Sequence, residues 1–172
     1  MAQTLSEYDW DNWQAQQVAT LLLIVRDGQV LLIRKKRGLG AGKINGPGGK
    51  IDPGETALQC AEREVQEEIG VTPRGTRAMG ELLFQFVSDL TIRVYVFRAD
   101  DLSGTLRETD EALPMWFDFD KVPYAEMWPD DEIWLPWLIA GHRYEGRVLI
   151  GENDTMLDHD LHVVADDHVW NW

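Results

Sequence analysis

The chain has 172 residues, 44% of them hydrophobic and 27% charged, which is the composition of one folded domain and excludes a low-complexity or collagen-like chain. Its 30 acidic and 16 basic residues give a formal net charge of −14, which argues against nucleic acid held on a basic surface. A small phosphate ester stays compatible with this charge if divalent cations lie between its phosphates and the carboxylates.

Nothing in the sequence resembles an export signal or a membrane anchor. Cys60 is the only cysteine, so no internal disulfide can form and a reducing compartment fits. Residues 1–10 contain no Lys or Arg and no apolar run, and the longest aliphatic run, residues 21–25, is too short to cross a bilayer. We therefore expect a cytoplasmic protein without a membrane partner and, because no coiled-coil seam is visible, a monomer.

The first 17 residues differ in character from the remainder of the chain. Residues 1–17 are polar apart from Trp10 and Trp13, and we expect an extension that docks, if at all, through these two indoles. A single domain is expected to fill residues 18–172.

A hairpin and a glycine-rich loop open this domain. Residues 18–26 and 29–35 are β-rich and flank Asp27-Gly28, a dipeptide that tolerates the positive φ angles of a tight hairpin. Residues 38–54 then hold seven glycines and two prolines, a density that predicts irregular backbone close to a ligand.

A helix is predicted over residues 57–69. Thr56 and Gln59 have the spacing of a capping box, and Gly70 stands where a C-cap glycine is expected. Its buried face would consist of Leu58, Ala61, Val65 and Ile69.

The rest of the chain adds strands and a second helix. We expect strands over residues 79–87, 91–98, 114–119, 143–150 and 157–165, and a helix over 129–140. Strands on both sides of a helix, with another helix late in the chain, indicate an α/β fold in which helices cover both faces of a mixed β-sheet.

Three glutamates gather on one side of the first helix. Glu64, Glu67 and Glu68 lie within about one turn of each other, so their charges repel. A solvated acidic face is the simplest alternative, but these carboxylates lie near the C-terminal end, where the helix dipole disfavours negative charge, and they follow a glycine-rich loop. Carboxylate oxygens in this arrangement suit Mg²⁺ or Mn²⁺.

The segment around these glutamates resembles a known motif. Residues 49–71, GKIDPGETALQCAEREVQEEIGV, fit the Nudix box, G-x5-E-x7-R-E-U-x-E-E-x-G-U with U aliphatic, at each specified position. The resemblance to Nudix hydrolases implies an α/β/α sandwich, a loop-helix-loop motif and hydrolysis of a nucleoside diphosphate linked to another group. It also implies metal ligation by Glu64, Glu67 and Glu68. Arg63 would orient the loop by pairing with Glu55.

Further segments are similar to the mammalian-type MutT homologues of this family, which hydrolyse oxidised purine nucleoside triphosphates. They are KKRGLGAGKINGPGGK at 35–50, FQF at 84–86, TDEALPMWF at 109–117, MWPDD at 127–131 and DTMLD at 154–158. The resemblance implies a purine pocket that contains Asn45, Trp128, Asp130 and Asp131. It further implies roles in substrate or metal binding for Thr20, Lys35, Gly48, Gly49, Phe84 and Glu111, with Gly48 and Glu111 at the metal.

These residue types suit a purine. Trp128 offers a flat surface for stacking, and Asn45 offers both donors and an acceptor. Two adjacent carboxyls that share one proton, Asp130 and Asp131, present one donor and one acceptor, so they suit a guanine-like or an adenine-like edge.

Each assignment has a structural alternative. Asp130 and Asp131 could cap the second helix, Trp128 and Phe84 could be core, Lys35 could be a strand-end charge and Glu111 a solvated loop residue. Pro47 departs from the aromatic residue of close family members; it lacks an N–H and could change the pocket rim.

The resemblance implies a Mg²⁺-dependent pyrophosphohydrolase, with Mn²⁺ as the alternative, that sanitises the nucleotide pool. Its small-molecule substrates would be oxidised purine triphosphates such as 8-oxo-dGTP and 2-hydroxy-dATP, and its products the monophosphate and pyrophosphate. Glu67, Glu68 or Glu111 would accept the proton from the attacking water. The alternatives are a Nudix hydrolase of a methylated purine triphosphate, a dinucleoside polyphosphate or a nucleotide sugar, and a non-catalytic nucleotide-binding module. A protein-interaction role for the tryptophan-bearing ends could coexist with catalysis.

Overall fold

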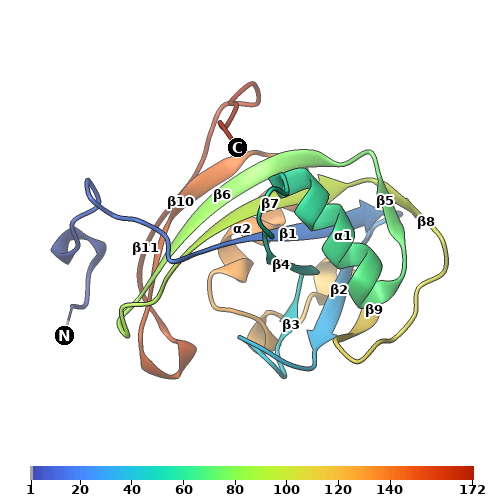
Figure 1. Cartoon of the computed structure of the whole chain (residues 1–172), viewed down its shortest axis with the longest axis horizontal. Helices are drawn as coiled ribbons and strands as arrows, with labels where there is room; N and C mark the ends of the chain where they lie inside the picture. Colours follow the sequence, from blue (N-terminus) through green and yellow to red (C-terminus); the bar gives the residue numbers. More distant parts are fainter. Residues whose placement is uncertain (1) are drawn as a thin grey trace.

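The computed structural model describes residues 2–172 and places a large mixed sheet at the centre of the fold (Figure 1). Its strands are β1 Gln17–Arg26, β2 Gln29–Lys35, β3 Ile44–Asn45, β4 Gly48–Lys50, β6 Arg77–Phe86, β7 Thr91–Ala99, β9 Ala112–Asp118, β10 Tyr144–Ile150 and β11 Met156–Val163. The strand order is β11-β10-β6-β7-β1-β2-β3, while β4 pairs with β1 and β9 pairs with β2. The β1–β7 and β6–β10 pairs are parallel and the others antiparallel.

Two α-helices, α1 Ala57–Ile69 and α2 Asp131–Ala140, pack on opposite faces of this sheet. The central strand β1 explains how, because it is apolar on both sides. Its Leu22 and Ile24 belong to the cluster that contains α1, whereas Leu23 and Val25 belong to the cluster that contains α2. Strand alternation thus turns one continuous aliphatic run into two cores, and the α/β/α sandwich is confirmed.

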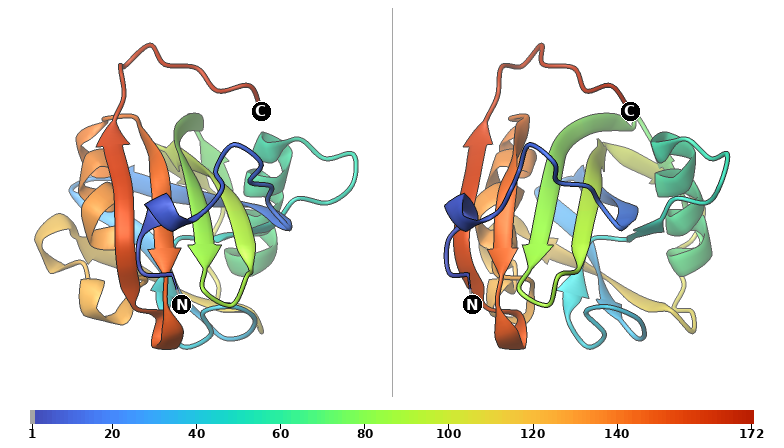
Figure 2. Two further views of the ribbon diagram at one scale, coloured as in Figure 1. Left: turned by 90° about the vertical axis from the view of Figure 1, so that its left-hand side faces the viewer. Right: turned by 60° about the vertical axis from the view of Figure 1, so that its left-hand side comes forward.

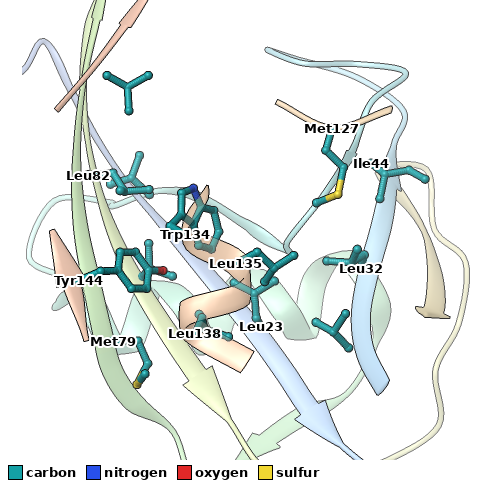
Figure 3. Close-up of a cluster of buried hydrophobic side chains, with 14 of the residues drawn as sticks. Leu23, Leu32, Ile44, Met79, Leu82, Met127, Trp134, Leu135, Leu138 and Tyr144 are labelled. Carbon is teal, nitrogen blue, oxygen red and sulfur yellow. The ribbon is translucent and has the colours of Figure 1, made fainter. Parts of the chain in front are cut away.

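The core beneath α2 is built around aromatic side chains. Trp134 of α2 stacks on Tyr144 of β10 with ring centroids 5.5 Å apart, and both are fully or almost fully buried. Leu135 and Leu138 continue this helix face towards Leu23, as Figure 3 shows. This packing fixes the start of α2, where the functional site lies.

Several boundaries match the sequence prediction. Asp27 and Gly28 both have positive φ angles at the β1–β2 turn, and α1 has the predicted bounds. The capping box of Thr56 and Gln59 is formed, and Gly70 is left-handed with a φ of 79°.

The glycine-rich segment differs from the prediction, because it contains the short strands β3 and β4. Gly48 lies against the backbone of Thr20 in β1, so that a Cβ on Gly48 would lie 1.8 Å from the Thr20 carbonyl oxygen. Glycine is therefore used here to bring two strands together, as well as for irregular backbone.

Leu58, predicted on the buried face of α1, is instead 42% exposed, whereas Ala61, Val65 and Ile69 are buried as predicted. Other differences are small. The second helix starts at Asp131, two residues after the predicted start, and the strand predicted from residue 114 starts at Ala112. A two-stranded sheet of β5 Thr72–Arg74 and β8 Asp101–Ser103 was not predicted. Short 3-10 helices occur at η1 Leu5–Glu7, η2 Phe119–Lys121, η3 Tyr124–Glu126 and η4 Glu152–Asp154.

The N-terminal residues cross the outer face of the sheet, opposite α2, over β10 and β11 (Figure 2). Trp10 lies against Arg147 of β10 and Trp13 bonds Gln85 of β6, so both indoles dock, but Leu5 of η1 is buried as well and contributes to the contact. Within residues 2–172, the structure contains no helix with the length and apolar character needed to span a bilayer.

Candidate active site

A cavity of about 480 Å³ opens between β1, the β6–β7 hairpin, the glycine-rich loop and the start of α2. The structure places all nine substrate-binding residues expected from the sequence on its wall: Thr20, Lys35, Asn45, Gly48, Gly49, Phe84, Trp128, Asp130 and Asp131. Glu68 of α1 also lines it, so one cavity contains both aspartates and a glutamate of the Nudix box. Sequence reasoning missed the apolar wall residues Leu21, Ile33, Leu90, Ile92 and Val94, which give only an ordinary strand pattern.

The two aspartates form a buried pair. Asp130 is 0% and Asp131 5% exposed. One carboxylate oxygen of Asp130 accepts a hydrogen bond from Trp134 Nε1 at 2.8 Å, and its other oxygen, Oδ1, is buried without a partner. Asp130 is the N-cap of α2 but makes no capping hydrogen bond with its side chain. Helix capping therefore does not explain why the Asp130 side chain is buried.

Burial changes the protonation of this pair. Removal from water raises the pKa of Asp130 to about 6, although the hydrogen bond from Trp134 opposes the rise. Burial and the adjacent Asp130 charge raise the pKa of Asp131 well above its ordinary value. The pair thus retains a proton more readily than two exposed aspartates.

Trp128 forms the aromatic wall of the cavity. Phe86 meets its ring edge-on with centroids 6.1 Å apart, and Lys43 Nζ lies 5.2 Å from its ring centroid. Gly40, with a φ of +80°, passes so close that a Cβ would lie 2.9 Å from Trp128 Nε1. The indole is half-buried and held from several sides, as a stacking platform requires.

Three carboxylates converge beside this cavity. Glu64, Glu68 and Glu111 each offer an oxygen, and these oxygens all lie within 4.8 Å of one another. Burial, together with the charge of Glu64, raises the pKa of Glu68 to about 8, and burial raises that of Glu64. Repelling carboxylates held this close fit a divalent cation with oxygen ligands. The backbone N–H of Gly48 donates to Glu68 Oε1 at 3.1 Å and orients that carboxylate.

Glu67 does not join this group. Its carboxylate is half exposed and accepts a hydrogen bond from Arg63 Nη1 at 3.1 Å. The same guanidinium bonds Glu64 at 2.9 Å and Glu55 at 2.6 and 2.9 Å. This confirms the expected Arg63–Glu55 pair, in which hydrogen bonds from Arg63 are the main cause that lowers the pKa of Glu55 to about 2. Arg63 therefore links the loop to the carboxylates of α1.

Glu111 is brought to the group by a loop whose position the sequence does not reveal. Arg37 Nη2 donates to Glu111 Oε1 at 2.9 Å. Thr109 Oγ1 donates to the backbone carbonyl of Glu68 at 2.7 Å and so ties the loop to the end of α1. Arg37 and Thr109 were not singled out from the sequence, because only the tertiary structure brings them to the site.

Two further residues have modest roles. Cys60 is fully buried, 3.3 Å from Thr20 Oγ1, and burial raises its thiol pKa to about 11, so it is an unreactive part of the core. Pro47 does not line the cavity, and its carbonyl accepts a hydrogen bond from Leu22 N at 2.8 Å. The contact that its backbone makes with β1 thus uses oxygen and does not need the missing N–H.

The α/β/α sandwich, with a glycine-rich loop followed by a helix that carries the carboxylates, agrees with the comparison with known protein families. The profile of the NUDIX domain matches residues 15–138, and the chain belongs to the Nudix family. As a member with the complete box, it is a Nudix hydrolase, an enzyme that acts on acid anhydrides.

The chain is similar to individual proteins of this family. The chain is 42% identical over 151 residues to the oxidized purine nucleoside triphosphate hydrolase of Danio rerio, covering 87% of this chain and 97% of that protein. It is 40% identical over 146 residues to the protein of the same name from Mus musculus, covering 84% and 94%. Among solved structures, a MutT protein from Bacillus halodurans has a TM-score of 0.76 at 25% identity, covering 84% of this chain and 97% of that one.

Proposed function

We propose that this protein hydrolyses oxidised purine nucleoside triphosphates, such as 8-oxo-dGTP and 2-hydroxy-dATP, to the monophosphate and pyrophosphate. The buried Asp130–Asp131 pair carries the proposal, because it lines the same cavity as Glu68, a member of the three-carboxylate group. In this proposal the aspartates form the purine end of the site and the glutamates the phosphate end. Two vertebrate relatives, which this chain matches over almost their whole length, have names that support the same substrate class.

The purine end would read its base by hydrogen bonding. Asn45 presents an amide to the cavity and the aspartate pair presents a donor and an acceptor. Relocating the proton between Asp130 and Asp131 exchanges those two roles. A pocket of this kind accepts more than one oxidised purine, since guanine-type and adenine-type edges differ in the order of donors and acceptors. Trp128 would stack on the base, which contributes about 1–3 kcal/mol.

The phosphate end would hold Mg²⁺, or alternatively Mn²⁺, through Glu64, Glu68 and Glu111. Glu67 bonds the same Arg63 side chain as Glu64. When bound, the cation supplies charge neutralisation at the phosphates and activation of the attacking water. Hydrogen bonds from Arg63 position Glu64 and Glu67, and a hydrogen bond from Arg37 positions Glu111. Glu67, Glu68 and Glu111 are the candidates for the proton acceptor.

The reaction would serve to remove damaged nucleotides before polymerases use them. The buried, unpaired Cys60 fits a reducing compartment, and we propose that the enzyme acts in the cytoplasm. A regulatory module that only binds nucleotide would not need three converging carboxylates, so the site favours catalysis over that alternative.

The experiment that tests this substrate class compares Asn45→Ala and Asp130→Asn with the wild type. Both variants should raise KM for 8-oxo-dGTP at least about tenfold, because each leaves a polar group of the base or pocket unpaired. Inhibition by magnesium tripolyphosphate, which has no base, should be unaffected. If discrimination among bases is unchanged in both variants, another Nudix substrate is the better assignment.

A further inference from the structure

The N-terminal segment, residues 2–16, lies on the face of the sheet opposite α2 (Figure 2). It is nevertheless hydrogen-bonded to β6 and β7, two strands that line the cavity. The wall in question is the β6–β7 hairpin. From its inner face, five side chains line the cavity: Phe84, Phe86, Leu90, Ile92 and Val94. The segment and the substrate therefore contact two faces of the same hairpin.

The first link runs through Gln85. Trp13 Nε1 donates to Gln85 Oε1 at 2.9 Å, and Gln85 Nε2 donates to the backbone carbonyl of Phe86 at 2.9 Å. Gln85 is only 4% exposed, so its amide has little access to water as a replacement partner. By strand alternation Gln85 faces outwards between two cavity residues, Phe84 and Phe86. One buried amide thus joins the indole of the segment to the strand that carries the wall.

The second link runs through Thr91 at the other side of the hairpin turn. Gln16 N donates to Thr91 Oγ1 at 2.8 Å, and the Thr91 hydroxyl donates to the Gln14 carbonyl at 2.9 Å. Gln16 Nε2 also donates to the backbone carbonyl of Asp89, within the turn, at 3.0 Å. Both strands of the hairpin and its turn are therefore tied to the segment.

The rest of the segment anchors these links to the far edge of the sheet. Trp10 stacks on Trp13 with centroids 5.5 Å apart, and Arg147 of β10 lies 4.5 Å from the Trp10 ring centroid. Leu5 is buried, and its N–H donates to Asp158 Oδ2 of β11 at 2.8 Å. The segment spans from β11 to the β6–β7 turn and can transmit the position of one to the other.

We infer that residues 2–16 are a positioning element for the purine pocket, which fixes the β6–β7 hairpin from outside and thereby sets where Phe84 and Phe86 stand against Trp128. The inference rests on the proposed function for its substrate and on the hydrogen bonds above for its mechanism. Phe86 of the hairpin contacts Trp128 in the purine pocket, and none of the three converging carboxylates belongs to the hairpin. Loosening the hairpin therefore weakens base binding and leaves the phosphate chemistry intact.

A matched pair of variants tests the inference in the full-length protein. Trp13→Phe removes the N–H that bonds Gln85 and keeps an aromatic ring. Trp10→Phe removes an equivalent indole hydrogen bond, Trp10 Nε1 to the Leu5 carbonyl at 2.7 Å, which stays within the segment. Thr91→Val removes the two hydrogen bonds of the Thr91 hydroxyl with little change of shape, and it keeps the bond from Gln16 Nε2 to the Asp89 carbonyl. The measurements are kcat and KM for 8-oxo-dGTP and the inhibition constant of magnesium tripolyphosphate, which has no base.

We expect Trp13→Phe and Thr91→Val to raise KM about threefold to tenfold, with kcat within about twofold and tripolyphosphate inhibition unchanged. Trp10→Phe should leave all three constants as in the wild type. Equal KM values in Trp13→Phe and Trp10→Phe would overturn the inference, and so would a parallel loss of tripolyphosphate inhibition, since that indicates general loosening of the fold.

Hydrogen exchange separates this inference from the proposed function. Trp13→Phe should increase amide exchange over residues 84–92, and Trp10→Phe should not. If the wild type hydrolyses no oxidised purine but this exchange difference is found, the substrate assignment fails and the positioning role stands. If exchange over 84–92 is the same in both variants, the positioning role fails whatever the substrate.

Discussion

Gly49, the first residue of the Nudix box, lies directly against Glu64 of α1. A Cβ on Gly49 would stand 2.5 Å from both the carboxyl carbon and Oε1 of Glu64. The absence of a side chain at residue 49 is thus what lets this carboxylate sit beside Glu68 and Glu111. The same strand, β4, approaches the backbone of Thr20 through Gly48, so adjacent glycines serve different purposes.

The two glycines should respond differently to alanine. In Gly49→Ala the new methyl meets the end of a flexible side chain, which can move away, so we expect a folded protein whose kcat falls about tenfold to hundredfold because Glu64 is displaced. In Gly48→Ala the methyl meets the Thr20 carbonyl oxygen, which is part of the backbone and cannot move away. We therefore expect the free energy of unfolding to fall by several kcal/mol. Thermal unfolding and kcat, measured on both variants, check this; a poorly folded Gly49→Ala would show that the contact with Glu64 cannot relax.

Glu68→Gln should stabilise the metal-free protein at high pH while it abolishes most activity. Folding raises the Glu68 pKa from 4.5 to about 8, so its contribution to stability is present below pH 4.5 and is lost as the pH rises to about 8. Glutamine mimics the protonated form and avoids this loss. We expect its Tm to match the wild type near pH 4 and to exceed it by about 2–8 °C at pH 9 in a chelator.

Glu62→Gln, on the same helix but outside the three-carboxylate group, is the control for that comparison. It should show no such pH-dependent difference. A Glu68→Gln protein that is less stable than the wild type at pH 9 would mean that Glu68 is not strained by its burial and by Glu64.

Glu67 and Glu68 should differ in the way they support catalysis. Glu67 is half exposed and bonded to Arg63, whereas Glu68 lies among the converging carboxylates. We expect Glu68→Gln to weaken the apparent affinity for Mg²⁺ about tenfold to hundredfold. We expect Glu67→Gln to lower kcat with a smaller change in that affinity. Measuring kcat as a function of the Mg²⁺ concentration for both variants distinguishes the two roles. Equal shifts in Mg²⁺ affinity would place Glu67 in the metal site together with Glu68.

Local sequence was sufficient where neighbouring residues determine the conformation. The Asp27-Gly28 turn and the capping box of Thr56 and Gln59 depend on contacts within a few residues, and both were predicted at the right positions. The wall of the cavity was predicted through resemblance, since Asn45, Trp128 and the aspartates are far apart in sequence and carry no shared periodicity.

Contacts between distant segments could not be predicted from the sequence. Strand β4 is three residues long and exists because β1 pairs with it, which no local pattern reveals. The bond from Thr109 to the Glu68 carbonyl and the burial of Leu5 likewise depend on segments that meet only in the folded chain. For the same reason the sequence does not decide whether Glu111 reaches the carboxylate group, and the structure places it there.

In the proposed function, one cavity binds an oxidised purine at the aspartate pair and its triphosphate is hydrolysed at the glutamates. The most direct test is pyrophosphate release by the wild type from 8-oxo-dGTP, 2-hydroxy-dATP, dGTP and dATP, with and without Mg²⁺, compared as kcat/KM. We predict metal-dependent release with the oxidised purines preferred by at least about tenfold, equivalent to about 1.4 kcal/mol in the transition state. Equal values for oxidised and normal purines, or no cleavage of any of the four with Mg²⁺ present, would contradict it.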